Sequence, residues 1–144
     1  MHRLLILAVC GLFALRASAA TDGLTEHERH TAQCVAALEV NTDDLAEQVK
    51  AGRADLQPLL LDRLRFGAAF IGDSYLQGER DEARAKGFLV AALEAQRALP
   101  QAELAARQSA CAQEGAQLLA NADFFTRTVV TRLAHRRMKK LLEG

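Results

Sequence analysis

Signals for helix starts and stops divide most of the chain into successive helical segments. The clearest start is the capping box Thr25-Glu26-His27-Glu28, and the short polar side chains of Asn41 and Asp55 can cap two further starts. Gly52 and Gly78 are good C-terminal stops. The segments between these signals are 25–40, 41–52, 55–77, 79 or 81 to 99, 101–120 and 124–142.

The composition favours the same fold. Alanine and leucine are abundant, whereas the chain has 2 prolines, no tryptophan and only 5% aromatic residues. No stretch alternates apolar and polar residues as a half-buried strand does. We therefore predict an all-α fold, a small helical bundle of about four main helices plus short pieces, which forms a single domain over residues 20–144.

Residues 1–19 have the pattern of a secretory signal peptide. A positive start, Met1-His2-Arg3, precedes an apolar run from Leu4 to Leu15, and Ala17-Ser18-Ala19 provides small residues for cleavage near Ala19 or Ala20. The run of about 12 residues is shorter than the 20 that a spanning helix needs, so a retained anchor is the less favoured alternative. Because arginine also outnumbers lysine, we predict a bacterial protein that is periplasmic or secreted.

Two cysteines, Cys34 and Cys111, remain after the predicted leader. Two thiols in one small domain of an oxidising compartment usually pair. Helical spacing places Cys34 on a face with Thr31 and Leu38, and it places Cys111 between Leu104 and Leu118 on the fifth segment. We predict a disulfide between these two segments; free thiols or an intermolecular bridge are the alternatives.

The segment 55–77 has the clearest packing face. Its large apolar residues fall in one broad sector of a helix: Leu56, Leu59, Leu60, Leu64, Phe66, Phe70, Ile71 and Tyr75. Gly67 and Ser74 are small positions inside this sector, and we expect a neighbouring helix to approach closely there. Asp62, Arg65 and Asp73 fall on the opposite side.

One short motif in this segment points to hydrolysis. Residues 70–78, Phe-Ile-Gly-Asp-Ser-Tyr-Leu-Gln-Gly, resemble the nucleophile block of the GDSL esterases and lipases. The resemblance covers about nine residues and implies that Ser74, placed after a strand, is a nucleophile served by a late Asp and His. The nearest late histidine is His135, and Arg132 stands where the acid would be. Since a serine nucleophile needs its base, we expect no enzyme activity and a packed Ser74.

Histidines suggest two further, weakly supported sites. His27, His30 and Cys34 lie on one side of the first segment, a geometry that can hold a metal ion, but three ligands from one helix make a poor set. A haem held without covalent attachment would need Met138 together with His27, His30 or His135. We expect neither metal nor cofactor, and we interpret these as surface histidines and a methionine at the edge of the core.

Charge is balanced in total, with 18 basic and 18 acidic residues, but it is segregated along the chain. Residues 21–55 are mainly acidic, whereas the last segment is basic. Its cations form a candidate docking patch: Arg132, Arg136, Arg137, Lys139 and Lys140. The patch could be a solvated helix face, could meet an acidic protein or anionic membrane, or could pack beside the acidic segments within or between subunits.

These observations predict a non-enzymatic, exported interaction or accessory protein of the bacterial envelope. Its partner would be an envelope protein, a second copy of the chain or an anionic membrane surface reached through the last helix. Nucleic acid is excluded as a partner by the predicted export. A bundle that binds a small ligand, haem or metal is the alternative function, and a hydrolase acting through Ser74 is the least favoured.

Overall fold

The computed structural model describes residues 23–78 and 81–144, and in this part of the chain all regular elements are helical. The predicted all-α fold is therefore confirmed. The helices are α1 (Glu26–Glu39), α2 (Thr42–Lys50), the 3-10 turn η1 (Ala54–Leu56), α3 (Gln57–Leu76), α4 (Glu82–Arg97), α5 (Gln101–Asn121) and α6 (Phe124–Glu143). Five of the described helices have 14 to 21 residues, one more than the four main helices predicted.

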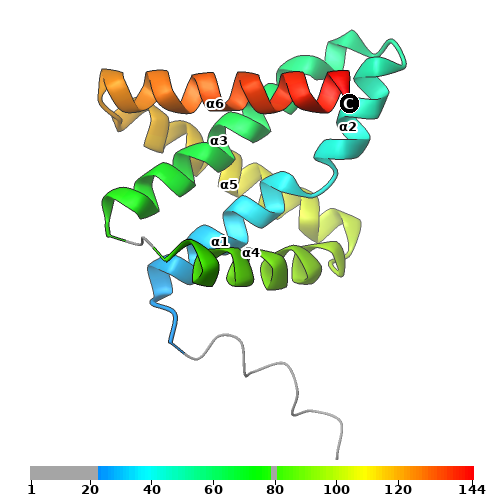
Figure 1. Cartoon of the computed structure of the whole chain (residues 1–144). Helices are drawn as coiled ribbons and strands as arrows, with labels where there is room; N and C mark the ends of the chain where they lie inside the picture. The colour runs from blue at the N-terminus through cyan, green and yellow to red at the C-terminus, as the bar shows by residue number, and fades with distance from the viewer. Residues whose placement is uncertain (1–22, 79–80) are drawn as a thin grey trace, which may run out of the picture.

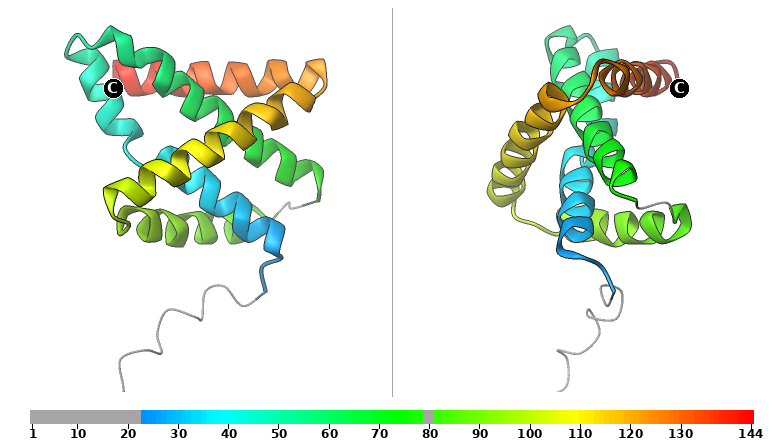
Figure 2. Two further views of the ribbon diagram at one scale, coloured as in Figure 1. Left: turned by 180° about the vertical axis from the view of Figure 1, so that it is seen from behind. Right: turned by 90° about the vertical axis from the view of Figure 1, so that its left-hand side faces the viewer.

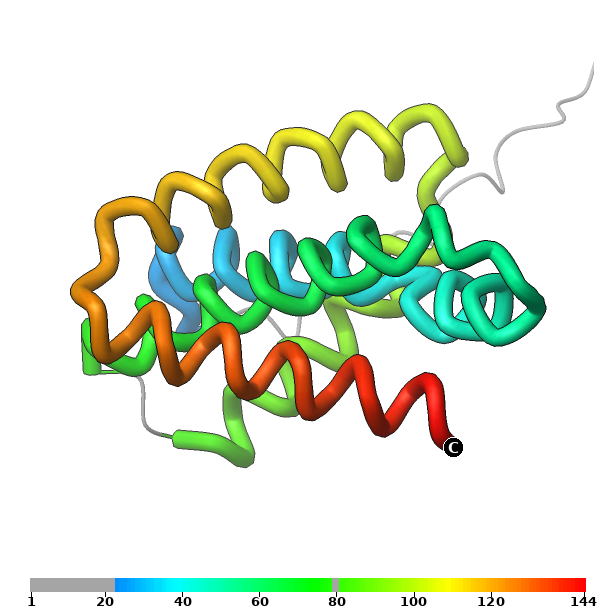
Figure 3. The backbone as a smooth tube through the Cα atoms, turned by 90° about the horizontal axis from the view of Figure 1, so that it is seen from above, coloured from blue at the N-terminus to red at the C-terminus, as the bar shows by residue number. Residues whose placement is uncertain are grey.

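Figure 1 shows the helices face-on, and along that line of sight they lie in three layers. Helix α5 forms one outer layer, α1 and α3 form the middle, and α4 and α6 form the other outer layer (Figure 2, Figure 3). Helices α3 and α5 cross in an X, so the arrangement differs from an up-and-down bundle of nearly parallel helices. The short helix α2 packs at one end against α3 and α6.

Side-chain caps begin three of the helices. The capping box of α1 is complete, because Glu28 N donates to Thr25 Oγ1 at 3.1 Å and Thr25 N donates to Glu28 Oε2 at 2.6 Å. Asp81 caps α4, and Asp123 accepts from Thr126 N at 2.9 Å to cap α6. These hydrogen bonds satisfy backbone N–H groups that have no partner inside the helix.

The other two predicted caps differ from the expectation. Asn41 is the N-cap residue of α2, as predicted, but its side chain makes no capping hydrogen bond, and its backbone is left-handed, with φ of 67°, in the tight turn between α1 and α2. Asparagine tolerates this conformation better than most residues. Asp55 lies inside η1 and forms an ion pair with Arg53 at 2.8 Å, and α3 begins without a side-chain cap.

A disulfide fastens α1 to α5, as predicted. Cys34 and Cys111 are bonded across a Cα–Cα distance of 5.3 Å, and both are buried. They belong to a core cluster with Val35, Leu38 and Phe70, which joins α1, α3 and α5. A second cluster, in which Leu45, Leu60, Leu64, Ala134 and Met138 are buried, joins α2, α3 and α6.

The prediction of close helix contact at Gly67 is wrong. No atom outside its own stretch of helix lies within 4 Å of the place where a Cβ on Gly67 would be. The close contact is at Gly115 of α5, where an added Cβ would lie 2.6 Å from Cβ of Phe66 on α3. The layer of α5 therefore packs tightly on α3, while the opposite side of α3 is open at Gly67.

The predicted apolar sector of α3 is only partly buried. Leu60, Leu64 and Phe70 are in the core, but Leu59, Ile71 and Tyr75 are 44%, 53% and 57% exposed. The sector is wider than the surface that the neighbouring helices cover.

The predicted signal peptide, residues 1–19, lies outside the described residues. None of the described helices combines the length and the apolar character needed to cross a membrane.

Candidate functional site

A large open groove runs along α6, with α3 and part of α1 as its floor. Its volume is about 1010 Å³, and we call it the front groove. Val35 and Leu38 of α1 and Leu64 and Gly67 of α3 lie deepest, because they are buried or nearly so. Helix α6 packs on α3 through Val130, Ala134 and Met138, while the neighbouring side chains Phe125, Val129 and Leu133 of α6 stay exposed along the front groove.

The walls of the front groove hold most of the exposed large apolar residues in the described part of the chain. On α3 these are Ile71, Tyr75 and Leu76; on α6 they are Phe125, Val129 and Leu133. Leu76 and Phe125 are 70% and 75% exposed. Single exposed hydrophobics are common on proteins, but a contiguous group of them usually marks a binding surface.

The end of the front groove toward the C-terminus is basic. Arg136, Arg137, Lys139 and Lys140 line it, so it contains four of the five cations of the predicted docking patch. The fifth, Arg132, is exposed on α6 but does not line the groove. The structure thus brings the basic patch and the apolar walls into one site.

The cations of this basic end differ in their partners. Arg137 pairs with Glu39 at the end of α1, and Lys139 lies 3.7 Å from Glu143 one turn along α6. Within the described residues, Arg136 and Lys140 have no ion-pair partner. They stand one turn apart on the same face of α6, so their charges are available to an anion in the groove.

Arg63 is a further cation on the floor of the front groove, but its guanidinium already donates hydrogen bonds within the protein. Its guanidinium donates to the carbonyl of Val40 at 3.2 Å and to Gln108 Oε1 at 3.0 Å. Burial lowers the pKa of Arg63, although a guanidinium remains protonated at neutral pH. Arg63 therefore ties α3 to the end of α1 and to α5, and we assign it to the frame of the site.

A second hollow, of about 400 Å³, lies between α4, α3 and the first half of α1. It shares Val35, Ile71 and Tyr75 with the front groove, so the two hollows meet at these side chains. Its remaining apolar lining includes Phe88 and Leu89 of α4. The apolar surface of the middle layer is thus continuous from α6 to α4.

The GDSL-like segment has a different structure from the one that the resemblance implies. Ser74 is buried inside α3, where the family places its serine after a strand. Its neighbour Asp73 lies 3.6 Å from His27, and within the described residues no histidine pairs with Ser74. His135 is exposed on α6.

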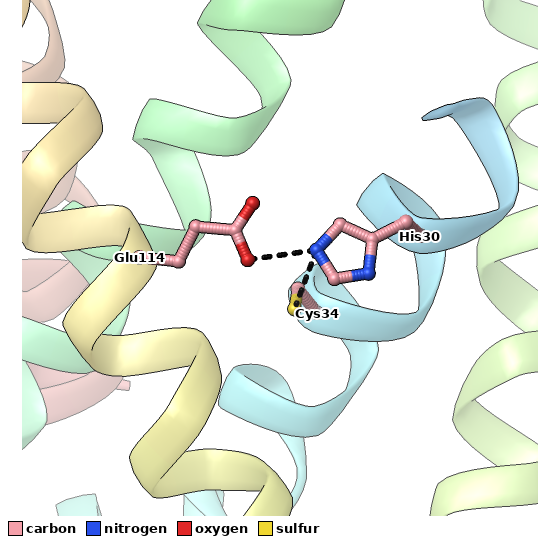
Figure 4. A group of neighbouring side chains, drawn as sticks. All are labelled: His30, Cys34 and Glu114. Carbon is pink, nitrogen blue, oxygen red and sulfur yellow. Dashed lines mark hydrogen bonds and ion pairs between the residues drawn. The ribbon is translucent and has the colours of Figure 1, made fainter. Parts of the chain in front are cut away.

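The candidate metal ligands are divided between two places. His27 faces Asp73 of α3, whereas Nε2 of His30 lies 2.7 Å from Oε2 of Glu114 on α5 and 3.9 Å from Sγ of Cys34 (Figure 4). His30, Cys34 and Glu114 are close enough together to share an ion, but the sulfur of Cys34 is committed to the disulfide. A disulfide sulfur is not a thiolate ligand, and the two side chains that remain are fewer than zinc sites use.

The predicted haem ligands do not favour a haem site. Met138 is buried in the cluster of α2, α3 and α6, while His135 is exposed on the same helix and His27 and His30 are on α1.

The front groove was missed by sequence reasoning. Two sequence signals could have indicated it. The apolar sector of α3 is unusually wide, and Phe125, Val129 and Leu133 follow a four-residue helical spacing on α6.

In comparisons with known proteins, no family model, curated protein or solved structure matches this chain. The geometry of its own residues therefore has to carry any assignment of function.

Proposed function

We propose that this protein is a non-enzymatic, exported binding protein of the bacterial envelope, and that the front groove is its binding surface. The observation that carries the proposal is the gathering of Ile71, Tyr75, Leu76, Phe125 and Leu133 along one groove while they remain exposed. Full burial of such a side chain contributes about 1.5 to 3 kcal/mol relative to full exposure, and a bound partner would supply the share of this free energy that the exposed fractions forgo.

The frame around the front groove supports this role. The disulfide and the Gly115 contact hold α1, α3 and α5 together on the side away from the groove, so the groove stays open without losing the core. A preformed apolar groove binds without a large ordering cost. Export follows from the predicted leader, and a disulfide is compatible with an oxidising compartment.

Fluorescence of the neutral dye N-phenyl-1-naphthylamine tests the proposal, because this dye brightens in apolar sites and carries no charge. We expect saturable binding by the wild-type protein. Leu133→Gln should weaken it about fivefold or more, since an apolar contact of this size contributes about 1 kcal/mol or more. Leu59→Gln is the matched control, because Leu59 is similarly exposed, at 44% against 52%, but lies outside the groove.

A second pair of variants compares neighbouring residues of one type. Phe125 lines the front groove and Phe124 does not, although both are highly exposed. Phe125→Ala should weaken dye binding and Phe124→Ala should not. The proposal would be wrong if the wild-type protein left the dye dark, or if both members of each pair lost binding equally while their circular dichroism spectra stayed native.

A further inference from the structure

We infer that the ligand of the front groove is a single-chain anionic lipid, with its acidic head at Arg136 and Lys140 and its acyl chain lying along Leu133, Val129 and Phe125. This inference rests on the proposed function and names the class of ligand. It follows from the order of side chains along α6, because the groove is apolar at one end and cationic at the other. An anionic lipid has the same two parts in the same order.

The length of the apolar part fits one acyl chain. Phe125 and Arg136 are separated along α6 by about three turns, or about 16 Å. Two acyl chains end to end make the hydrocarbon core of a bilayer, which is about 30 Å thick, so one chain is about 15 Å long. The volume of the groove, about 1010 Å³, is at the upper end of the range for small-molecule sites.

The head site is provided by two cations that have no ion-pair partner among residues 23–78 and 81–144. Arg136 and Lys140 repel one another across one turn of α6, and an anion placed between them would relieve this repulsion. Arg137 is paired with Glu39 of α1, and Lys139 lies near Glu143 on α6, so the charges of these two cations are already matched. The shared chemistry is therefore a carboxylate or phosphate at the end of a single hydrocarbon chain.

The distribution of charge favours this lipid over a partner helix. An acidic amphipathic helix would spread its carboxylates along its length, and charge complementarity would then place cations beside Phe125 and Val129 as well. The groove-lining residues near that end are apolar or uncharged: Tyr75, Leu76, Phe125, Thr126 and Val129. The cations gather at one end only, as a molecule with one charged head requires.

Competition against N-phenyl-1-naphthylamine tests the inference, with hexadecanoate as the ligand and neutral hexadecanol as its uncharged counterpart. Hexadecanoate should displace the dye more strongly than hexadecanol. The double variant Arg136→Gln, Lys140→Gln should weaken hexadecanoate about tenfold or more and leave hexadecanol unchanged. The matched control is Arg127→Gln, Arg132→Gln, which removes two exposed cations of the same helix that do not line the groove.

The outcomes separate this inference from the proposed function. If the dye binds but hexadecanoate does not displace it, or displaces it no better than hexadecanol does, the groove binds apolar molecules and the anionic lipid is wrong. Equal losses in the double variant and its control would also overturn the head site. If even the dye fails to bind, the proposed function fails with it.

Photocrosslinking in cells identifies the natural occupant directly. A benzophenone amino acid in place of Phe125 should give an adduct whose added mass is that of a single-chain lipid. An adduct with another protein or with a second copy of this chain would overturn the inference in favour of that partner. Binding to intact anionic vesicles without transfer of lipid into the groove would likewise overturn it, because the cations would then serve a membrane surface.

Discussion

The two faces of α3 differ in how far neighbouring helices cover them. One face is closed by α5, where Gly115 lets the helices touch at Phe66 and the disulfide secures α1 nearby. The other face is half open, because α6 covers it only along the line of Val130, Ala134 and Met138. The closed face provides the rigid frame, and the open face exposes the apolar surface on which we place the ligand.

The largest effect should come from removing the disulfide. The double variant Cys34→Ser, Cys111→Ser should lower the free energy of unfolding by about 4 kcal/mol, because the bridge closes a loop of 77 residues and limits the unfolded chain. Urea denaturation followed by circular dichroism measures the change. A loss below about 1 kcal/mol would mean that packing alone holds the closed face together.

Gly115→Ala should give the next largest effect. The new methyl group would lie 2.6 Å from Cβ and 3.1 Å from Cα of Phe66, and backbone cannot move aside cheaply. We expect a loss of about 1 to 3 kcal/mol from overpacking, even though alanine favours helix more than glycine does. Denaturation in urea is again the measurement. An unchanged or raised stability would show that α3 and α5 are not in close contact.

Gly67→Ala should change the free energy of unfolding in the opposite direction and by a smaller amount. Gly67 is also buried in a helix, but it lies on the floor of the front groove with nothing within 4 Å of the added Cβ. Alanine should therefore raise the free energy of unfolding by about 0.5 to 1 kcal/mol through helix propensity alone. Together with Gly115→Ala it forms a matched pair, and two changes of the same sign would erase the difference between the faces.

Local signals made much of the fold predictable from the sequence. Helix starts and stops depend on a few neighbouring residues, as at the capping box of Thr25 and at Gly52 and Gly78. The disulfide could be predicted because two cysteines on apolar helix faces usually pair in an oxidising compartment. The helix signals led to the correct all-α class, and the cysteines led to the correct disulfide. The two caps that lack the expected hydrogen bond have local reasons as well. Asn41 takes a left-handed backbone in a tight turn, and the side chain of Asp55 pairs with Arg53.

The front groove could not be predicted in the same way. Periodicity shows that Leu60 and Ile71 belong to one apolar sector of α3, but it does not show that α6 covers the first and leaves the second exposed. That difference depends on the crossing of α6 over α3, which is set by side chains on both helices. Gly67 was misjudged for the same reason, since a small residue permits a close neighbour without providing one.

The smallest effect concerns the start of α6, which carries Phe125 into the front groove. A backbone hydrogen bond from Thr126, reinforced by its hydroxyl, lowers the pKa of Asp123. A carboxyl with a lowered pKa stabilises the folded state above its unfolded pKa, near 3.9, and loses that contribution as the pH falls through the folded value. The melting temperature of the wild-type protein should therefore exceed that of Asp123→Asn slightly at pH 7, and the gap should shrink in acid.

This last comparison separates the cap from the general effect of acid. Asp55→Asn is the control, because the hydrogen bond to Arg53 also lowers the pKa of Asp55. Asp55 lies in η1, away from the start of α6, and does not line the front groove. Dye binding by the wild-type protein and by Asp55→Asn should weaken as the pH falls through the folded pKa of Asp123, because this carboxylate fixes the turn that presents Phe125. Asp123→Asn has no carboxyl to titrate at this position and should lack that pH dependence. Equal pH dependence of dye binding in both variants would show that the open face does not rely on the start of α6.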